Sequence, residues 1–400
     1  MFKSKKHFIK HRKPSLLIVS QYYPPETGAS QNRLRCLAQH LSEQGYKVSV
    51  LTAMPNYPVG KIFPGYRNRI FCQENMGTIR VFRTWVYATK SKSIIKRMLN
   101  YLSFASTALF FGFFFIRDID LLFWESPPLF LGPFARVLAW SKHAKCIMNV
   151  ADLWPETAIA LGLVSKDSKA TRLAERLEMW LYRHSDAITG QTQGIIDYIA
   201  HRVPSIPIHL FPNGVDLELF KPLEPDPLLA QKLGLANKFV VGYGGLMGYV
   251  SGLEQAIDAA EQLKDQKDIV FAMFGDGPVK DSLIEKSRKK NLSNVRFFPT
   301  QEVTLMPKIM SLWDIGLVTL ADRPLFSGVR PSKMFAIMGV GKPIVYCGRG
   351  EGAAIVEKNA CGVVVPPERP DLLAKAIRSL YEDRSKLNKM GINALRAARE

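Results

Sequence analysis

The stretch Phe326–Tyr346, FSGVRPSKMFAIMGVGKPIVY, is the part of the sequence from which the rest of the chain can be interpreted. It runs from a loop through a short apolar helix to a glycine-lysine-proline turn and a strand. Arg330 and Lys333 come at the start of the helix, where unpaired backbone N–H groups and the positive end of the helix dipole favour an anion. Taken alone, the pattern fits a diphosphate site and an ordinary helix start with solvated charges equally well.

Length and charge limit the classes of protein to consider. A chain of 400 residues exceeds one ordinary core, so two domains are expected. The 54 Lys and Arg against 35 Asp and Glu give a net charge of +19, which implies an anionic partner: nucleic acid, an anionic leaflet or a phosphorylated substrate. The five cysteines are scattered without a CxxC pair, which favours a reducing compartment and no disulfide or zinc framework. No nucleic-acid-binding signature accompanies the positive charge.

The N-terminal half, residues 14–218, begins with a βαβ unit. The apolar run Ser15–Ser20 predicts a buried parallel strand, Leu34–Gln44 a helix, and Lys47–Thr52 the next strand. The loop between the first strand and the helix, QYYPPETGASQNR, follows the carboxyl end of a strand, where open α/β sheets bind ligands. Residues 1–13 form a basic tail that either contacts phosphates or lipid headgroups or is merely disordered, and they make a poor signal peptide.

An unusual apolar stretch covers residues 99–116, LNYLSFASTALFFGFFFI, after a lead rich in lysine and arginine. Eighteen uncharged residues approach the length of a membrane span. Three interpretations remain open: a buried core helix, a helix lying in the membrane interface with its basic flank on anionic headgroups, and a true span.

A candidate sugar-binding cluster follows the strand Lys145–Val150. Asp152, Trp154 and Glu156 lie close together on the loop that leaves this strand. An aromatic ring beside two carboxylates suits a sugar, because the ring stacks on its apolar face while the carboxylates accept from its hydroxyls. The alternative is an ordinary turn with its tryptophan in the core.

The proline-rich segment Leu219–Leu235 predicts the interdomain linker, and residues 219–400 repeat the βα pattern. After the strand Phe239–Tyr243, Gly244, Gly245 and Gly248 crowd one strand-to-helix turn, which lets a phosphate approach the backbone. The predicted fold class is α/β, with two doubly wound parallel-sheet domains.

An ordered set of motifs resembles the family 4 retaining glycosyltransferases of the GT-B fold, in which two such domains face each other across a cleft. The resemblance covers Leu16 to about Tyr381, and its motifs are, in chain order, YYPPETGAS, ESPPLFLG, NVADLWPETAIALGL, FPNGVDLELF, GYGGLMGYVSGLEQAI, FGDGP and VRPSKMF. The second and third resemble the fucosamine-transferase-like branch of O-antigen and exopolysaccharide biosynthesis.

The resemblance implies roles for particular residues. The C-terminal domain would hold a nucleotide-sugar, expected to be UDP-linked, and Arg330 and Lys333 would stabilise the leaving diphosphate by electrostatics without a metal. Asp152 and Glu156 would face the sugar from the other domain. The remaining implied residues are, on the donor side, Gly244, Gly245, Gly248, Ser332 and Asn213, and on the acceptor side, Glu26, Gly28, Arg33 and Trp154.

The sequence departs from the family pattern at five positions. Two glutamates eight residues apart usually contact the donor sugar and the ribose, and here these positions are Gly328 and Ala336. Tyr249 and Ser251 replace a basic residue and a lysine of the glycine loop, and Ala151 stands where a His or Arg is common. The helical pattern at the end of the chain also suggests a shortened version of the helix that closes many GT-B proteins.

The expected function is transfer of a hexosyl or acetamidohexosyl group, with retention, to a lipid-linked glycan acceptor. The protein would then be cytoplasmic and peripheral on the inner leaflet of the plasma membrane. The alternative is a catalytically impaired homologue that binds glycan or lipid as a scaffold.

Overall fold

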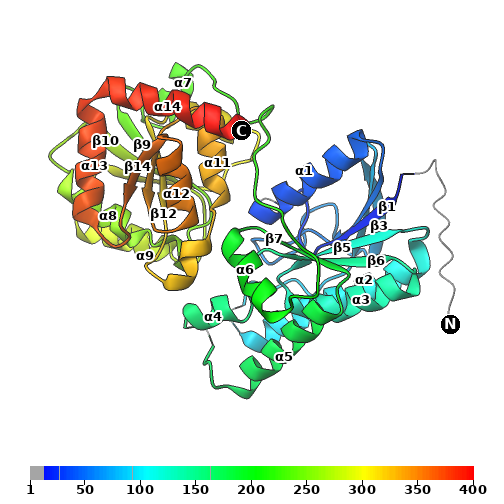
Figure 1. The fold of residues 1–400 in the computed structure, drawn as a ribbon. Coiled ribbons are helices and arrows are strands. Elements are labelled where there is room, and N and C mark those ends of the chain that lie inside the picture. Colours follow the sequence, from blue (N-terminus) through cyan, green and yellow to red (C-terminus); the bar gives the residue numbers. More distant parts are fainter. Residues whose placement is uncertain (1–12, 27, 92, 163) are drawn as a thin grey trace.

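The structure, a computed structural model, describes residues 13–26, 28–91, 93–162 and 164–400 (Figure 1). The basic tail expected at residues 1–13 therefore lies outside the described residues, except for Lys13. Two α/β domains follow each other along the chain, as the sequence predicts, and each is built on a largely parallel sheet.

The N-terminal domain has an eight-stranded sheet in the order β3-β4-β2-β1-β5-β6-β7-β8. All neighbouring strands are parallel except the edge pair β3 and β4, a hairpin closed at Gly77. The strands are β1 (Ser15–Val19), β2 (Lys47–Ala53), β3 (Phe71–Met76), β4 (Ile79–Thr84), β5 (Leu121–Ser126), β6 (Lys145–Val150), β7 (Ala187–Gly190) and β8 (Ile208–Leu210). The helices are α1 (Ala29–Glu43), α2 (Ile94–Phe115), α3 (Gly132–Ser141), α4 (Glu156–Ala160), α5 (Lys169–Arg183) and α6 (Gln193–Arg202).

The C-terminal domain has a six-stranded parallel sheet in the order β11-β10-β9-β12-β13-β14. Its strands are β9 (Phe239–Gly244), β10 (Ile269–Phe274), β11 (Val295–Phe298), β12 (Ile315–Thr319), β13 (Ile344–Cys347) and β14 (Gly362–Val365). Its helices are α7 (Pro227–Lys232), α8 (Glu254–Gln262), α9 (Lys280–Lys289), α10 (Met306–Ser311), α11 (Ser332–Gly339), α12 (Glu351–Lys358), α13 (Pro370–Glu382) and α14 (Arg384–Arg399), with short 3₁₀ turns at Tyr249–Ser251 and Pro324–Gly328.

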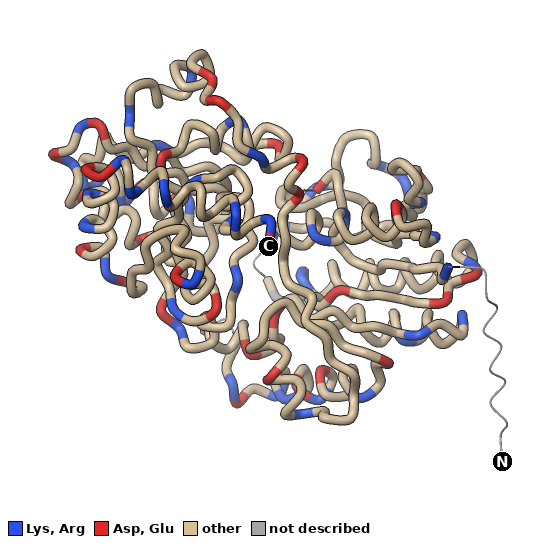
Figure 2. The backbone as a smooth tube through the Cα atoms, turned by 45° about the horizontal axis from the view of Figure 1, so that its top comes forward, with Lys and Arg blue, Asp and Glu red and all other residues tan. Residues whose placement is uncertain are grey.

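The central strands are apolar because helices cover both faces of each sheet. Every residue of β1 and β10 is buried, and each strand consists mainly of Leu, Ile, Val and Phe. Residues 211–226 carry the chain from β8 to α7, and α14 packs on α11. Lysines and arginines occur over both domains (Figure 2), so the net charge alone does not mark one site.

The apolar stretch 99–116 forms most of α2, which is long and apolar enough to cross a membrane by length and composition. The helix nevertheless packs along α3, β2 and β4 of the N-terminal domain, and only 28% of its most apolar window is buried there. One side of α2, with Phe104, Ala105 and Ala108, lies in the core of the domain, and the other side is exposed. The interpretation as a buried core helix therefore holds for one side only, and the two membrane interpretations stay predictions.

Candidate active site between the two domains

The glycine loop after β9 is held by a second glycine loop, which follows β10. The N–H of Gly245 donates to the carbonyl of Phe274 at 3.0 Å, and the N–H of Met247 donates to the carbonyl of Asp276 at 2.8 Å. A Cβ on Gly277, whose φ is +152°, would collide with the carbonyl oxygen of Met247. A Cβ on Gly248, by contrast, would meet only the side chain of Leu246, at 3.5 Å, so the space beside Gly248 is open.

Lys333 lies directly against this loop. Its Nζ donates to the Tyr243 hydroxyl at 2.6 Å and stands 3.9 Å from the centre of that ring. A Cβ on Gly245 would be 3.4 Å from the same nitrogen. Ser332 begins α11, and no side chain caps the start of that helix. The structure thus brings the glycine loop and the cationic start of α11 together, although they are about ninety residues apart in sequence.

Arg330 has a different partner from the one implied by the resemblance. Its Nε lies 2.7 Å from the carboxylate of Glu351, at the start of α12. The same carboxylate accepts from the backbone N–H of Gln193 at 3.1 Å and of Gly194 at 2.7 Å, the first residues of α6 in the other domain. Glu351 therefore joins the two domains and neutralises Arg330. Sequence reasoning missed Glu351, because an acidic residue in the first helical turn is common.

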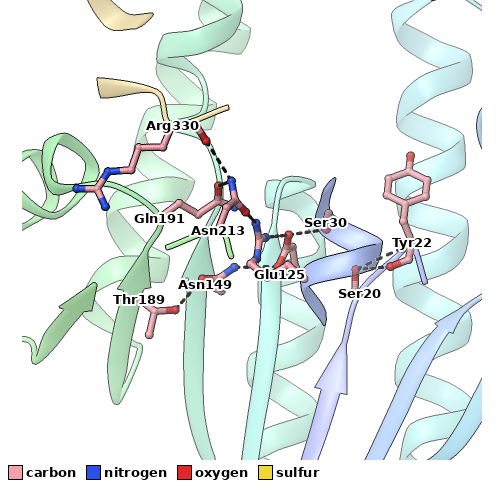
Figure 3. A network of polar contacts seen from close by, with 10 residues as sticks. Ser20, Tyr22, Ser30, Glu125, Asn149, Thr189, Gln191, Asn213 and Arg330 are labelled. Atoms are coloured by element: carbon pink, nitrogen blue, oxygen red, sulfur yellow. Dashed lines mark hydrogen bonds and ion pairs between the residues drawn. The ribbon is translucent and has the colours of Figure 1, made fainter. Parts of the chain in front are cut away.

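A largely buried polar network connects the segment 211–226, which joins the two domains, to both of them (Figure 3). This segment begins before the predicted linker Leu219–Leu235, of which residues 227–232 are helix α7. The side chain of Asn213 donates to the backbone carbonyl of Arg330 at 3.3 Å and to Gln191 at 3.1 Å. Its oxygen accepts from Arg33 at 2.7 Å. Arg33 pairs with Glu125 at the end of β5, and both side chains are almost inaccessible, at 6% and 3% exposure. Asn213, predicted as a donor ligand, and Arg33, predicted on the acceptor side, are thus joined in one network that touches the Arg330 segment.

Glu125 is the centre of that network and was not among the predicted residues. Besides Arg33, it accepts from Ser30 at 2.6 Å and from Asn149 at 2.8 Å, and Asn149 accepts in turn from Thr189 at 2.8 Å. These side chains come from the carboxyl ends of three neighbouring strands and from the start of α1, so the parallel topology alone brings them together.

The predicted sugar cluster divides in the structure. Asp152 is exposed at the surface of the domain, but neighbouring protein groups displace water from its carboxyl group and raise its pKa to about 6. Glu125 raises this pKa further, and Arg33 lowers it. Trp154 is half-buried. Glu156 points instead toward α6, where the Tyr198 hydroxyl donates to it and Arg202 lies 3.6 Å away. Burial raises the pKa of Glu156. The prediction that Glu156 faces the sugar beside Asp152 is not what this geometry shows, because its carboxylate is engaged within the N-terminal domain.

Glu26, predicted on the acceptor side, holds loops rather than facing open space. Its buried carboxylate accepts from the N–H groups of Tyr23 at 3.3 Å and of Asn56 and Tyr57 at 2.7 Å each. Burial raises its pKa to about 7 despite these bonds. Gly28, also predicted there, stands immediately before α1. The half-exposed rings of Tyr22 and Tyr57, 5.3 Å apart, form the aromatic surface of this region, and no sequence pattern predicts that they pair.

Four of the positions that depart from the family pattern differ in the space around them and in their exposure. A Cβ on Gly328 would meet Gly194 and Thr192 only at 3.8 Å, so the backbone leaves room for a side chain there. Ala336 packs against the core of the C-terminal domain. Tyr249 is half exposed and Ser251 is buried, accepting from Tyr243 at 3.3 Å. Among the residues that the structure describes, no three His, Cys, Asp or Glu side chains are grouped to hold a metal ion.

Comparison with known proteins agrees with the two-domain fold and the loops described above. Residues 28–214 match the glycosyl transferase 4-like domain, and residues 227–397 match the glycosyl transferases group 1 family. The chain is 28% identical over 374 residues to WcaI of Escherichia coli, which is named as a colanic acid biosynthesis glycosyl transferase; the match covers 91% of each chain.

Solved structures show the same fold. Sucrose-phosphate synthase from Thermosynechococcus elongatus superposes with a TM-score of 0.73 at 16% identity, covering 96% of this chain and 94% of that one. HepE of Anabaena, in complex with UDP-glucose, gives 0.69 at 17% identity with the same coverage. The fold class is therefore GT-B, and the prediction of that class is confirmed. The chain belongs to the glycosyltransferases, with a glycosyl transferase 4-like domain joined to a group 1 domain.

Proposed function

We propose that the protein transfers a hexosyl or acetamidohexosyl group from a UDP-linked donor to a lipid-linked glycan, with retention, during assembly of a cell-surface polysaccharide. The observation that carries the proposal is the position of the Lys333 ammonium against Gly245 of the glycine loop. A cation, the unpaired N–H groups at the start of α11 and a loop without side chains together suit a diphosphate. WcaI supports the polysaccharide context, and HepE supports a uridine nucleotide.

The proposed chemistry depends on stabilising the leaving group. The bond between the anomeric carbon and the diphosphate oxygen breaks, and the diphosphate leaves with the electron pair. The acceptor hydroxyl oxygen bonds to the same face of the sugar and releases its proton to a phosphate oxygen. Lys333 and the backbone donors stabilise the negative charge that develops, so no metal is required. Asp152, exposed on the opposite domain, is the carboxylate available to the sugar hydroxyls.

The donor site is tested by measuring binding before turnover. UDP, GDP and dTDP are compared by thermal shift, and we expect UDP to raise the melting temperature of the protein most, because a ligand that binds only the folded state stabilises it. Lys333→Ala should weaken that binding by roughly 10- to 100-fold, the loss of one charge-assisted contact. Tyr243→Phe should weaken binding less than Lys333→Ala, since it keeps the charge and the ring beneath it and removes only the hydroxyl that holds Lys333.

Turnover is tested with the donor that binds and a lipid-diphosphate glycan acceptor. The expected product is a longer glycolipid with an unchanged anomeric configuration. The absence of carboxylates at Gly328 and Ala336 favours one competing function, an impaired homologue that acts as a scaffold. That alternative predicts no turnover with any donor and no effect of Lys333→Ala on association with partner enzymes.

The proposed location is the inner leaflet of the plasma membrane, where a lipid-linked acceptor would be presented to a cytoplasmic enzyme. Exposed apolar side chains on α2 support this location.

A further inference from the structure

The outer side of α2 carries an apolar stripe. Ile95, Leu99, Leu102, Phe110 and Phe113 follow one another at helical spacings, interrupted only by a serine, and between 36% and 73% of each side chain is exposed. Residues at such spacings share one side of a helix. The stripe therefore runs along nearly the whole length of α2 and is open to solvent.

The opposite side of α2 fixes the stripe in this outward position. Phe104, Ala105 and Ala108 are buried in the core of the N-terminal domain. At Gly112 the helix lies so close to the domain that a Cβ would stand 2.7 Å from Leu138 of α3 and 3.1 Å from Leu51 of β2. The helix cannot turn its apolar stripe inward without breaking this contact.

The neighbouring helix α3, which lies beside α2 (Figure 1), extends the apolar surface. Trp140 and Val137 of α3 are 72% and 48% exposed, and Phe114 and Phe115 at the end of α2 are more than half exposed. Soluble monomers rarely expose a contiguous apolar surface of this kind unless it contacts a partner or a membrane. We call the exposed apolar side chains of α2 and α3 the aromatic face.

Charge selects the partner for the aromatic face. From residue 79 to residue 117 the sequence contains no Asp or Glu. Lys96 and Arg97 lie in the first turn of α2, and Arg117 and Lys142 lie at its other end. Lys142 stands 5.1 Å from the ring centre of Phe113, and burial together with Arg117 lowers its pKa. Cations at both ends of an apolar stripe match the headgroups and the acyl boundary of an anionic leaflet.

We propose that the aromatic face is a membrane-docking surface on which α2 and α3 lie in the plane of an anionic leaflet without crossing it. Packing against the domain along one side of α2 favours this arrangement over a span, because a span would need to separate α2 from α3 and β2.

The inner side of α2, opposite the aromatic face, contacts the loop after β1 on the acceptor side of the candidate site. The side chain of Gln21, in the loop after β1, donates to Asn100 of α2 at 2.6 Å, and Asn100 donates to the carbonyl of Tyr87 at 2.7 Å. Tyr22, next in that loop, packs against Tyr57, with the ring centroids 5.3 Å apart. This contact joins the loop after β1 directly to α2, so docking of α2 would hold that loop near the membrane; its use for a lipid-linked acceptor rests on the proposed function.

Vesicle flotation with the full chain tests the docking surface independently of catalysis. We expect co-flotation with vesicles of 70% phosphatidylcholine and 30% phosphatidylglycerol, and little with phosphatidylcholine alone. Changing Phe110, Phe113 and Trp140 together to serine should lower the partition coefficient by about 100-fold, since each ring contributes part of its transfer free energy. Leu173→Ser is the matched control, because Leu173 of α5 is 66% exposed on the same domain.

A second measurement covers the case in which the triple variant fails to fold. Brominated anionic lipids should quench part of the tryptophan fluorescence of the wild type, and Trp140→Phe should remove that part while keeping flotation. Equal flotation of wild type and triple variant, or no quenching at Trp140, would overturn the docking surface. Protein that resists extraction by alkaline carbonate would overturn the in-plane arrangement. Unchanged UDP binding by the triple variant would separate a failure of docking from a failure of the donor site.

Discussion

Removing Glu125 should destabilise the N-terminal domain strongly, because the Arg33–Glu125 pair is buried. The two side chains are 6% and 3% exposed, so Glu125→Ala leaves a guanidinium without a counter-charge in a region closed to water. It also removes the acceptor for Ser30 and Asn149. Breaking a buried pair by removing one partner costs about 3–5 kcal/mol. For a domain of this size, that corresponds to a fall in melting temperature of about 10 °C.

The Arg33–Glu125 pair as a whole should contribute much less to the free energy of unfolding than either single change suggests. Changing both residues, Arg33→Met with Glu125→Leu, removes the uncompensated charge and leaves only Ser30, Asn149 and Asn213 short of a partner. Replacing buried ion pairs by apolar side chains is often nearly neutral. We expect the double variant to lose at least about 3 kcal/mol less than the sum of the single variants Arg33→Met and Glu125→Leu.

Tryptophan fluorescence during urea unfolding measures the free energy of unfolding of the N-terminal domain, because five of the six tryptophans lie in that domain and only Trp313 lies in the other. Trp124 is buried directly beside Glu125 on β5. Lys145→Ala is the control, since its pair with Asp186 is solvent-exposed and should contribute less than about 1 kcal/mol. Additive effects of the single changes, within about 0.5 kcal/mol, would refute the reasoning.

Three further changes test other parts of the structure. Glu351→Gln should weaken the contact between the domains by about 2 kcal/mol, because the carboxylate charge is lost from its bonds to two N–H groups and a guanidinium. Small-angle scattering should then show a larger radius of gyration, whereas Glu357→Gln on the same helix should leave the radius unchanged. Gly277→Ala should destabilise the C-terminal domain by about 2–3 kcal/mol in thermal unfolding because of its positive φ and the close carbonyl, whereas Gly248→Ala should be nearly neutral. Glu26 binds its proton more tightly in the folded state, with a pKa of about 7 against 4.5 unfolded, so its contribution to stability is complete below about pH 4.5 and is lost as the pH rises through 7. The melting temperature should therefore fall by a few degrees from about pH 5 to pH 8, and the same slope in Glu26→Gln would contradict this origin.

Local patterns in the sequence predicted most of the elements. Apolar runs such as Ile269–Phe274 predict buried parallel strands, because helices cover both faces of the sheet. The hairpin of β3 and β4 escaped prediction. Its outer strand, FCQENM, is polar enough to resemble a loop, and it lies at the exposed edge of the sheet.

The candidate site was predictable only where family motifs coincide with local chemistry. The glycine loop and Lys333 could be named from the sequence, and the fold brings them together. Glu351 could not be named, because its partners at the start of α6 are about 158 residues away and carry no distinguishing side chain. Glu26, which the family resemblance implied on the acceptor side, has a further role that its sequence context did not indicate: its carboxylate accepts from three backbone N–H groups and holds that loop. Its contact with an acceptor stays a prediction.

Arg330 and Lys333 have different roles in this arrangement, although the sequence suggests two equivalent cations. Within the part of the chain that the structure describes, no carboxylate pairs with the Lys333 ammonium, which lies against the open glycine loop. The Arg330 guanidinium is neutralised by Glu351, which also holds α6 of the other domain, and the Arg330 carbonyl accepts from Asn213 of the segment 211–226. A diphosphate at the glycine loop can therefore pair with Lys333 without disturbing the contact between the domains. A diphosphate that drew Arg330 toward it would instead take Arg330 from Glu351 and weaken that contact. Binding to Lys333 and opening of the domains should consequently respond to different substitutions, Lys333→Ala changing the first and Glu351→Gln the second.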